Sequence, residues 1–223
     1  MPIGITMTVF EYELKPIDKG YNNRTLYVNL GDGNIKSKPV SQEMKEKYIG
    51  GKGFDLWLLW NSLPNDRIIQ WDDPENEVLI SCGPLGGFSV FPGTGKSIVV
   101  SISPTTGSVV DSNVGGYFGP YLKYSGWDTL EIQGKDEGDV ILYIDGDKRE
   151  VSILDAGDLP SESYGLSMLL HDRYGPKNVS VVSAGPGAEN TLIGCLNFSW
   201  YDLGRKAVRY KQAGRGGIGT VFR

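Results

Sequence analysis

The chain has 223 residues, of which 39% are hydrophobic and 22% charged, a composition typical of a globular protein with a substantial core. Its net charge of -5 and isoelectric point of about 5.0 argue against nucleic acid as the main partner, because phosphate backbones are bound by concentrated basic surfaces. The sequence contains no apolar stretch of the roughly 20 residues that span a bilayer and no secretory signal at its start, so we expect a cytoplasmic protein.

The numbers of cysteines and glycines indicate which kinds of site the chain can contain. The two cysteines, Cys82 and Cys195, are far apart and form no CxxC pair, so the sequence predicts no disulfide framework and no iron–sulfur or zinc site in this chain. Glycine is unusually frequent, with 31 residues, about twice the usual share of ~7%. The glycines cluster in short motifs between apolar runs, where a backbone turns sharply or approaches a ligand closely.

The start of the chain predicts an irregular segment followed by a hairpin. Residues 1–22 are expected to wrap the surface or contact a partner without regular structure. The run 26–30 predicts a strand, and Gly31 and Gly33 supply the positive φ that a tight turn requires before a second strand from Ile35.

Beyond the hairpin, strands and helices are interspersed without a regular βαβ rhythm, which favours an α+β fold. Ser41 is expected to cap a helix that runs through Ile49, and glycine-rich residues 50–53 separate it from an apolar helix over 54–60. Further strands are expected at 78–81, 97–103, 129–133, 140–144 and 179–183, and further helices from 113–119 to about Gly126 and over 163–174.

A weak internal repeat suggests a duplication. Leu26-Tyr27-Val28 recurs as Leu142-Tyr143-Ile144, each opening a strand–turn–strand unit that is followed by a helix and a short apolar strand. Gly115-Gly116 has a counterpart in Gly216-Gly217. Because such a pattern also arises by chance, the repeat is a hypothesis, which predicts two similar α+β halves with equivalent glycine loops and a two-fold ligand between them.

The two glycine loops, 111–116 and 211–217, are the candidate binding site. In both, glycines precede an expected helix start, where free backbone N–H groups and the helix dipole favour an anion such as a phosphate. Lys211 and Arg215 add positive charge, and arginine can bind phosphate through two parallel hydrogen bonds. The alternative is that these glycines only allow close packing or cap turns, and the sequence leaves both interpretations open.

Other motifs carry less. Residues 93–97 (GTGKS) resemble the end of a P-loop, but the first glycine is missing and a strand follows, so ATP binding by this route is rejected. His171 has no catalytic partner motif, and no GxSxG elbow is present. The residues alone indicate an anion-binding α+β domain without a complete catalytic constellation.

The motifs, taken together, resemble the amino-terminal domain of the aldehyde:ferredoxin oxidoreductase family. The resemblance covers nearly the whole chain from about Asn23, which divides it into an irregular segment, 1–22, and one domain, 23–223. It is carried by seven blocks in the family's order: LYVNLGDGNIK, YIGGKGFDLWLL, PENEVLISCGPLGG, PGTGKSIVVSISPTTG, DSNVGGYFGPYLKYSGWDTLEIQGK, SAGPGAEN and AGRGGIGTV.

The resemblance implies two similar, intertwined α+β halves that form the base for a tungsten (or molybdenum) bis-pterin cofactor, with magnesium bridging the two pterin phosphates. By motif position, the cofactor-binding residues are Lys96, Asn113, Gly115, Lys211, Gln212, Ala213, Gly214 and Arg215. Asn113 and Gln212 are the metal-binding positions, each contributing a carbonyl oxygen of the kind that magnesium prefers. Lys96 stands where aldehyde-oxidising members carry arginine, so the charge is kept but the forked geometry is lost.

The resemblance also implies an oxidoreductase that oxidises an aldehyde or reduces a carboxyl- or aryl-CoA-type substrate, with electron transfer to a [4Fe–4S] cluster. Family members carry that cluster and their acid–base residues in further domains, and the four cluster cysteines are absent from this sequence. Because the chain ends at Arg223 within an expected helix, we expect a truncated product or the first piece of a split enzyme, with no catalytic residue and no activity alone.

Expected partners are a C-terminal iron–sulfur part or subunit, ferredoxin-like or other electron-transfer subunits, and a second copy in a homo-oligomer. The stretch 198–211 is longer than in aldehyde-oxidising members and, with Lys96, resembles the branch that holds the catalytic subunits of ATP-independent benzoyl-CoA reductases. The competing hypothesis is a non-catalytic assembly or interaction module, a subunit of a split enzyme.

Overall fold

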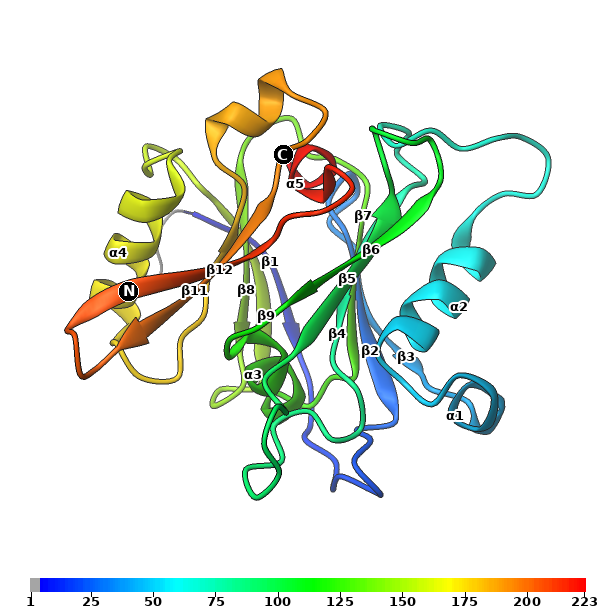
Figure 1. Cartoon of the computed structure of the whole chain (residues 1–223), viewed down its shortest axis with the longest axis horizontal. Coiled ribbons are helices and arrows are strands. Elements are labelled where there is room, and N and C mark those ends of the chain that lie inside the picture. Colours follow the sequence, from blue (N-terminus) through cyan, green and yellow to red (C-terminus); the bar gives the residue numbers. More distant parts are fainter. Residues whose placement is uncertain (1–4) are drawn as a thin grey trace.

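In the computed structural model, which describes residues 5–223, three sheets surround two short helices in an α+β arrangement (Figure 1). The largest sheet has six strands in the order β3-β2-β7-β4-β5-β6. Its strands are β2 (Arg24–Asn29), β3 (Ile35–Pro39), β4 (Glu77–Ser81), β5 (Ser97–Ile102), β6 (Val109–Val114) and β7 (Thr129–Gln133). β2 and β7 run parallel, and the other neighbouring strands of this sheet run antiparallel.

Two three-stranded antiparallel sheets make up the rest of the β structure, with the orders β1-β9-β8 and β10-β11-β12. Their strands are β1 (Thr6–Glu11), β8 (Val140–Asp145), β9 (Glu150–Asp155), β10 (Val182–Ser183), β11 (Leu196–Asp202) and β12 (Ala207–Ala213). A 3₁₀ helix, η1 (Pro186–Asn190), lies between β10 and β11.

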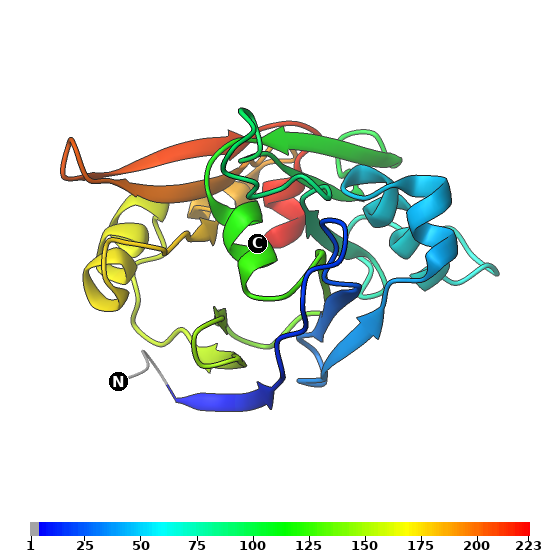
Figure 2. The ribbon, with the colours of Figure 1, turned by 90° about the horizontal axis from the view of Figure 1, so that it is seen from below.

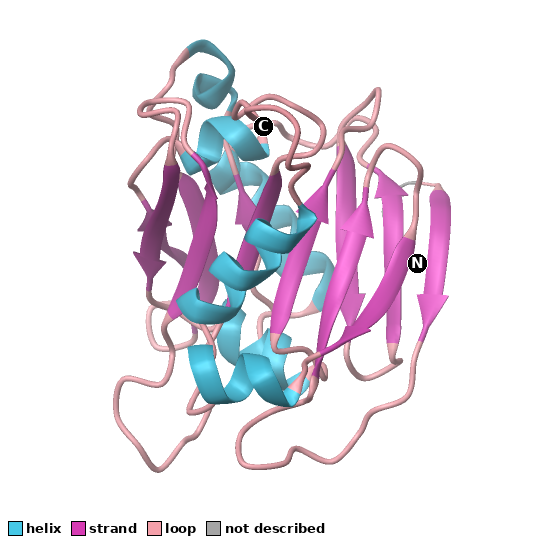
Figure 3. Ribbon diagram, turned by 90° about the vertical axis from the view of Figure 1, so that its right-hand side faces the viewer, coloured by secondary structure: helices cyan, strands magenta, loops and turns pink. Residues whose placement is uncertain are grey.

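The helices lie both outside and inside this frame. α1 (Gln42–Tyr48) and α2 (Lys52–Ser62) lie in front of the large sheet in Figure 3, where α2 contacts β4 and β5. α4 (Ser163–Tyr174) packs outside β11 and β12. α3 (Phe118–Tyr124) and α5 (Ile218–Phe222) lie in the interior, with strands on several sides of them (Figure 2).

One apolar cluster fills the interior and draws on every sheet. It includes Leu26 and Ile80 of the large sheet, Val151 of β9 and Phe198 of β11, none more than 1% exposed. α5 contacts β4 and β5 of the large sheet as well as β11, so the two parts of the chain interlock. Because interiors are packed as densely as organic crystals, this shared core holds the sheets in a fixed relative position.

Several expectations from the sequence are confirmed. The first hairpin forms with Val28 opposite Ile35, and Ser41 caps α1 by accepting the backbone N–H of Met44 at 3.1 Å. The helix expected over 163–174 has those bounds. In each case the signal was local, namely glycine in a tight turn, a polar cap or a helix ended by Gly-Pro.

The expectation of an irregular segment at 1–22 is wrong for part of it. Thr6–Glu11 form β1, which pairs antiparallel with β9. Met7 and Val9 are each 51% exposed, so the strand buries little apolar surface of its own and is held by a ladder to residues far along the chain. Such long-range pairing leaves little local pattern to detect.

Other differences concern strand extent. The expected strand over 179–183 is reduced to Val182–Ser183, while β6, β11 and β12 were not predicted. β9 is the second strand of the strand–turn–strand unit that the repeat predicted after Leu142. Ile49 does not belong to the α1 interior: it ends the helix at a φ of 66° and is 64% exposed. A β-branched residue rarely adopts that conformation, which is why the helix was expected to include it.

The strand registers confirm the duplication. In the large sheet, Ser81 of β4 pairs with Ile98 of β5, which pairs with Asn113 of β6. In the second half, Ser183 of β10 pairs with Asn197 of β11, which pairs with Gln212 of β12. Ser81 and Ser183 are the last residues of the short apolar strands of the two halves, so β4-β5-β6-α3 and β10-β11-β12-α5 are copies of one unit.

Candidate functional site

A pocket of about 590 Å³ lies where the ends of the two copies meet. Its walls come from β6 and the end of β12 with the loop that follows: Asp111, Ser112, Asn113, Gln212, Gly214 and Arg215. β6 and β12 are in contact, and each is an edge strand of its sheet within residues 5–223. Edge strands present backbone N–H and C=O groups outside the ladder, which suits a polar ligand.

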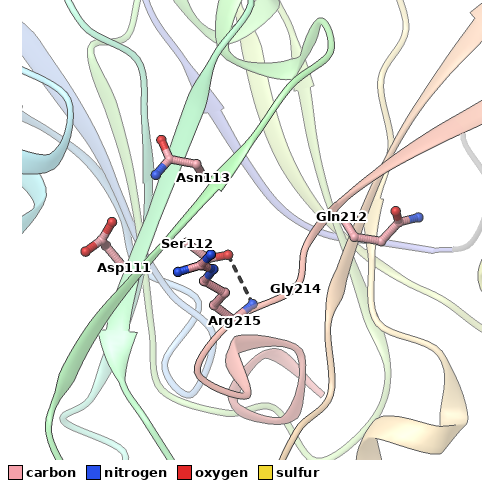
Figure 4. Close-up of a pocket in the computed structure, with 6 residues that line it drawn as sticks. All are labelled: Asp111, Ser112, Asn113, Gln212, Gly214 and Arg215. Atoms are coloured by element: carbon pink, nitrogen blue, oxygen red, sulfur yellow. Dashed lines mark hydrogen bonds between the residues drawn. The ribbon is translucent and has the colours of Figure 1, made fainter.

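One hydrogen bond ties the two loops together. Ser112 is 1% exposed, and its Oγ accepts the backbone N–H of Arg215 at 3.2 Å. Figure 4 shows this bond between β6 and the loop after β12, with Asn113 on one strand and Gln212 on the other, their side chains directed apart. The relative position of the two loops is therefore fixed by protein contacts.

The glycines of the two loops divide into two kinds. A Cβ added at Gly214 would meet nothing within 4 Å, and one at Gly115 would meet only Lys211 Cγ at 3.8 Å. In contrast, a Cβ at Gly216 would overlap Val110, and one at Gly217 would overlap the carbonyl of Leu192. The packing interpretation therefore holds at Gly216 and Gly217, and the space around Gly115 and Gly214 leaves ligand binding there a prediction.

Gly216 and Gly217 are therefore needed for packing and for their φ of 67°, while Gly115 and Gly214 leave main chain open to a ligand. Gly115 and Gly214 each stand two residues after the matched strand residues Asn113 and Gln212. Gly116 and Gly216 each stand two residues before the first residue of the helix that follows, α3 or α5. The second loop is thus one residue longer than the first.

The charge of the site is unevenly distributed. Lys211 and Arg215 are exposed, and the ion pairs found among the described residues involve neither of them. Asp111 is the one acidic residue of the pocket wall, and Lys52 at the start of α2 pairs with it at 2.5 Å. The carboxylate is thus offset by Lys52, and the two remaining cations are available to an anion.

The other predicted residues lie nearby in different ways. Ala213 is fully buried and belongs to the apolar core, so neither its side chain nor its main chain is open to a ligand. Lys96 is exposed and stands two residues before Ile98, which pairs with Asn113. Because side chains alternate along a strand, Lys96 and Asn113 lie on the same face of the sheet. Lys96 does not line the pocket wall. The structure thus brings Asn113, Gln212, Gly214 and Arg215 together, with Lys211 beside Gly115.

The sequence placed Asp111 and Ser112 in the first candidate loop without a role for either, and it gave no indication of Lys52. Asp111 and Ser112 stand in the quoted block DSNVGG, but an acidic residue in an anion pocket was not expected. Lys52 belongs to the glycine-rich break before α2, 59 residues from its partner in sequence, and no local signal links the two.

A second polar cluster lies away from the pocket, buried between the large sheet and α2. Glu131 pairs with Lys38 at 2.6 Å and also bonds Thr25, while Ser81 donates to Asp55 at 2.6 Å. Burial raises the pKa of Asp55 well above its usual range. Burial, reinforced by the charge of Glu131, raises the pKa of Glu77 to about 8. Among the described residues no group of three or more His, Cys, Asp or Glu is arranged to hold a metal ion.

Fold and site define a duplicated α+β domain with a polar, partly cationic pocket between its two copies. The family model for the aldehyde ferredoxin oxidoreductase N-terminal domain matches residues 25–223. The chain therefore belongs to the aldehyde ferredoxin oxidoreductase family, as its N-terminal domain. Within residues 5–223 no helix is long and apolar enough to cross a membrane.

Known relatives agree with this assignment. The tungsten-containing aldehyde ferredoxin oxidoreductase of Pyrococcus horikoshii is 36% identical over 209 residues, covering 91% of this chain and 32% of the relative. That of Pyrococcus abyssi is 36% identical over the same shares. A solved active-site complex of benzoyl coenzyme A reductase, BamBC with 1,5-dienoyl-CoA, has a chain that matches with a TM-score of 0.76 at 29% identity. That match covers 91% of this chain and 29% of the other. The chain thus spans about a third of the length of its relatives.

Proposed function

We propose that the pocket between β6 and β12 binds a tungsten (or molybdenum) bis-pterin cofactor, and that the chain is the cofactor-binding part of an oxidoreductase. The observation that carries this proposal is the pair of matched rows, which set Asn113 and Gln212 at the same position of duplicated edge strands beside one pocket. A ligand made of two like pterin halves fits a pocket made of two like protein halves.

The residues present fit such a ligand. Gly115 and Gly214 leave the main chain open to close approach, while Ala213, directly before Gly214, anchors the loop in the core. We assign Lys211 and Arg215 to offset the charge of the pterin phosphates. We assign the same role to Lys96, which lies on the face of the large sheet that carries Asn113. Carbonyl oxygens of Asn113 and Gln212 would hold a magnesium ion between those phosphates, since magnesium prefers oxygen ligands.

When bound, the cofactor would supply the redox chemistry of the metal and its dithiolenes, and this chain would supply binding, orientation and electrostatics. The relatives' names support an aldehyde substrate, and the likeness to the benzoyl coenzyme A reductase complex supports a carboxyl- or aryl-CoA-type one. We place the [4Fe–4S] cluster, the acid–base residues and the contacts to electron-transfer subunits in a partner part or subunit, so this chain alone would be inactive in the cytoplasm.

The test is elemental analysis for tungsten, molybdenum and magnesium on protein isolated anaerobically from its own host with copurifying chains retained. We expect tungsten or molybdenum near one per chain, and at least a fivefold loss of that metal in the double variant Lys211→Ala/Arg215→Ala. Arg205→Ala is the matched control, because Arg205 is an exposed arginine of the same hairpin that pairs with Asp202 at 2.8 Å. Absence of both metals from the native preparation would overturn the proposal.

The competing hypothesis, a non-catalytic assembly module, is favoured by one surface. Four apolar side chains of the β4–β5 loop are at least 55% exposed: Leu85, Phe88, Val90 and Phe91. Large exposed apolar groups that lie close in sequence mark a surface that a partner covers. Copurification of a partner in metal-free form, lost on Phe88→Asp but not on the double variant above, would favour this role.

A further inference from the structure

α2 lies over the large sheet (Figure 3) and covers a row of three carboxyl groups. Asp55 of α2, Glu77 of β4 and Glu131 of β7 are each 0% exposed. Leu79, in the middle of β4, pairs with Glu131. Glu77 begins β4, and Ser81, which ends it, donates to Asp55 at 2.6 Å. The three acids therefore follow one another along β4, out of contact with water.

This row holds more acids than counter-charges. Lys38 of β3 pairs with Glu131 at 2.6 Å. Within residues 5–223, neither side-chain oxygen of Glu77 has a hydrogen-bond partner, and Oδ1 of Asp55 has none either. The groups that face Glu77 are Glu131 of β7, Lys38 and Lys36 of β3, and the Ser62 hydroxyl of α2. Because an unpartnered carboxylate is costly in the interior, burial raises the pKa of Asp55 and of Glu77 and favours their neutral forms.

The connection that leads into α2 is strained. Ile49, Gly50 and Gly51 have φ angles of 66°, 148° and 55°. A β-branched residue such as Ile49 rarely adopts a positive φ, and residues held in such conformations are found where a segment changes position. At its other end α2 is followed by the exposed residues 65–68. The helix can therefore move about residues 49–51 without breaking a strand of the sheet.

The first residue of α2 connects this helix to the pocket. Lys52 pairs with Asp111 of the pocket wall at 2.5 Å. Asp55 stands three residues further along α2, and residues at that spacing are neighbours on a helix surface. The element that covers the carboxyl row thus also supplies the cation that neutralises the acid of the pocket.

We propose that α2 is a pH-dependent switch, which lies on the large sheet while Glu77 and Asp55 are protonated and leaves it when Glu77 ionises. Release of the helix separates Lys52 from Asp111 and leaves a carboxylate without its counter-charge in the pocket wall. Anions are then bound less firmly as pH rises. This last effect rests on the proposed function, whereas the movement of α2 does not.

The direction of the switch follows from burial. A carboxyl group that is neutral beneath the helix becomes charged when opening brings it into water, so opening releases a proton and is favoured by rising pH. Glu77 titrates at 4.5 when exposed and at about 8 in place. Opening should therefore increase between these two values, roughly tenfold per pH unit for each carboxyl group that is released, and level off above them.

The test is hydrogen–deuterium exchange of the whole chain between pH 5 and 9, corrected for the intrinsic pH dependence of amide exchange. We expect the protection of 54–62 to fall roughly tenfold per pH unit up to pH 8 and to be at least tenfold below that of β4 at pH 8. Equal protection of α2 and β4 at every pH overturns the proposal, because the helix would then open only with the whole fold.

Two variants assign the effect to the carboxyl row. Glu77→Gln keeps the shape of the side chain but does not ionise, so it should remove at least tenfold of the change between pH 5 and 8. Asp55→Asn tests the same row from the helix and decides the matter if the first variant does not fold. Glu75→Gln, at an exposed carboxylate paired with Arg67, is the matched control and should keep the original profile. A pH profile that neither buried variant alters also overturns the proposal.

Trypsin reports on the link to the pocket, because it cleaves after Lys52 only when the start of α2 is unwound. Cleavage there, normalised to a peptide substrate at each pH, should be at least tenfold faster at pH 8 than at pH 6.5. A constant rate of cleavage would show that Lys52 stays on Asp111 and would refute the coupling. Both readouts are made without cofactor, so their failure leaves the proposed cofactor site untouched.

Discussion

The two halves share their strand rows but differ in the layer beneath their outer helices. Under α2, the carboxyl groups of Asp55, Glu77 and Glu131 are fully buried. Under α4, the buried polar groups are Ser167, His171 and Ser199, with Nε2 of His171 3.1 Å from Ser199 Oγ. The rows beside the pocket kept their geometry while the outer layers diverged, so duplication constrains the sheet more than what covers it.

The two layers also respond to pH in opposite directions. Glu77 has a pKa raised to about 8, so its contribution to stability is present below its unfolded value of 4.5 and is lost as pH rises through 8. Burial lowers the pKa of His171 from 6.5, so its contribution is present above 6.5 and is lost as pH falls below it.

The largest expected effect separates two equivalent strands, β2, which lies between β3 and β7, and β8, which pairs with β9 alone within residues 5–223. Leu26→Ala should lower the free energy of unfolding by about 3 kcal/mol, because it leaves a cavity in a closed core. Leu142→Ala, at the equivalent but partly buried position, should cost roughly half as much. Urea denaturation of both variants measures the difference, and equal losses would show that the difference in burial between β2 and β8 does not affect stability.

The next effect concerns the buried carboxyl groups under α2. Between pH 4.5 and 8 the unfolded chain releases the Glu77 proton while the folded chain keeps it, so stability should fall by up to about 1.4 kcal/mol per pH unit. Glu77→Gln should flatten this slope. Unfolding free energies at several pH values test it, with Glu75→Gln, an exposed carboxylate paired with Arg67, as control. An unaltered slope in the Glu77 variant would show that other groups titrate there.

A smaller effect is expected at the contact between the two loops. Ser112→Ala removes the acceptor for the Arg215 N–H and should lower the free energy of unfolding by about 1 kcal/mol. Exchange of the Arg215 amide should accelerate, whereas Ser108→Ala, in the exposed turn before β6, should change neither quantity. No change at the Arg215 amide would mean that the loops are held by other contacts.

The smallest expected effect concerns His171, in the buried polar group under α4. His171→Gln can retain a hydrogen bond to Ser199 but does not titrate, so the acid side of the stability profile should flatten below pH 6.5. Thermal midpoints between pH 5 and 7 measure it. A profile of unaltered steepness would show that protonation of this histidine does not destabilise the fold.

The sequence predicted the elements with local signals. Ser41 as a cap, the glycine turn at 31–34 and the bounds of α4 needed only neighbouring residues, and the family motifs identified the two loops. β1 and the β11–β12 hairpin were missed because their ladders join residues whose side chains alternate only weakly between apolar and polar. The expected strand at 179–183 is shorter because only Val182 and Ser183 pair in register with β11.

At the site, motif positions identified Asn113, Gln212 and Arg215, but not the residues that hold them. The buried hydroxyl of Ser112 serves a loop more than a hundred residues away, and Lys52 neutralises Asp111 from the start of α2. Contacts of that length follow from the fold and leave no periodic pattern in the chain. The division of glycines into packing and open positions likewise required the coordinates.

The matched rows also make Ser112 of β6 equivalent to Lys211 of β12, and Asp111 equivalent to Tyr210, in the two copies of the unit. A backbone built twice therefore carries two unequal electrical environments, neutral or acidic on one side and basic on the other. Any guest with two chemically identical ends would meet a different potential at each end. Its ends would become distinguishable, with one held more firmly and made the better electron acceptor by the neighbouring positive charge.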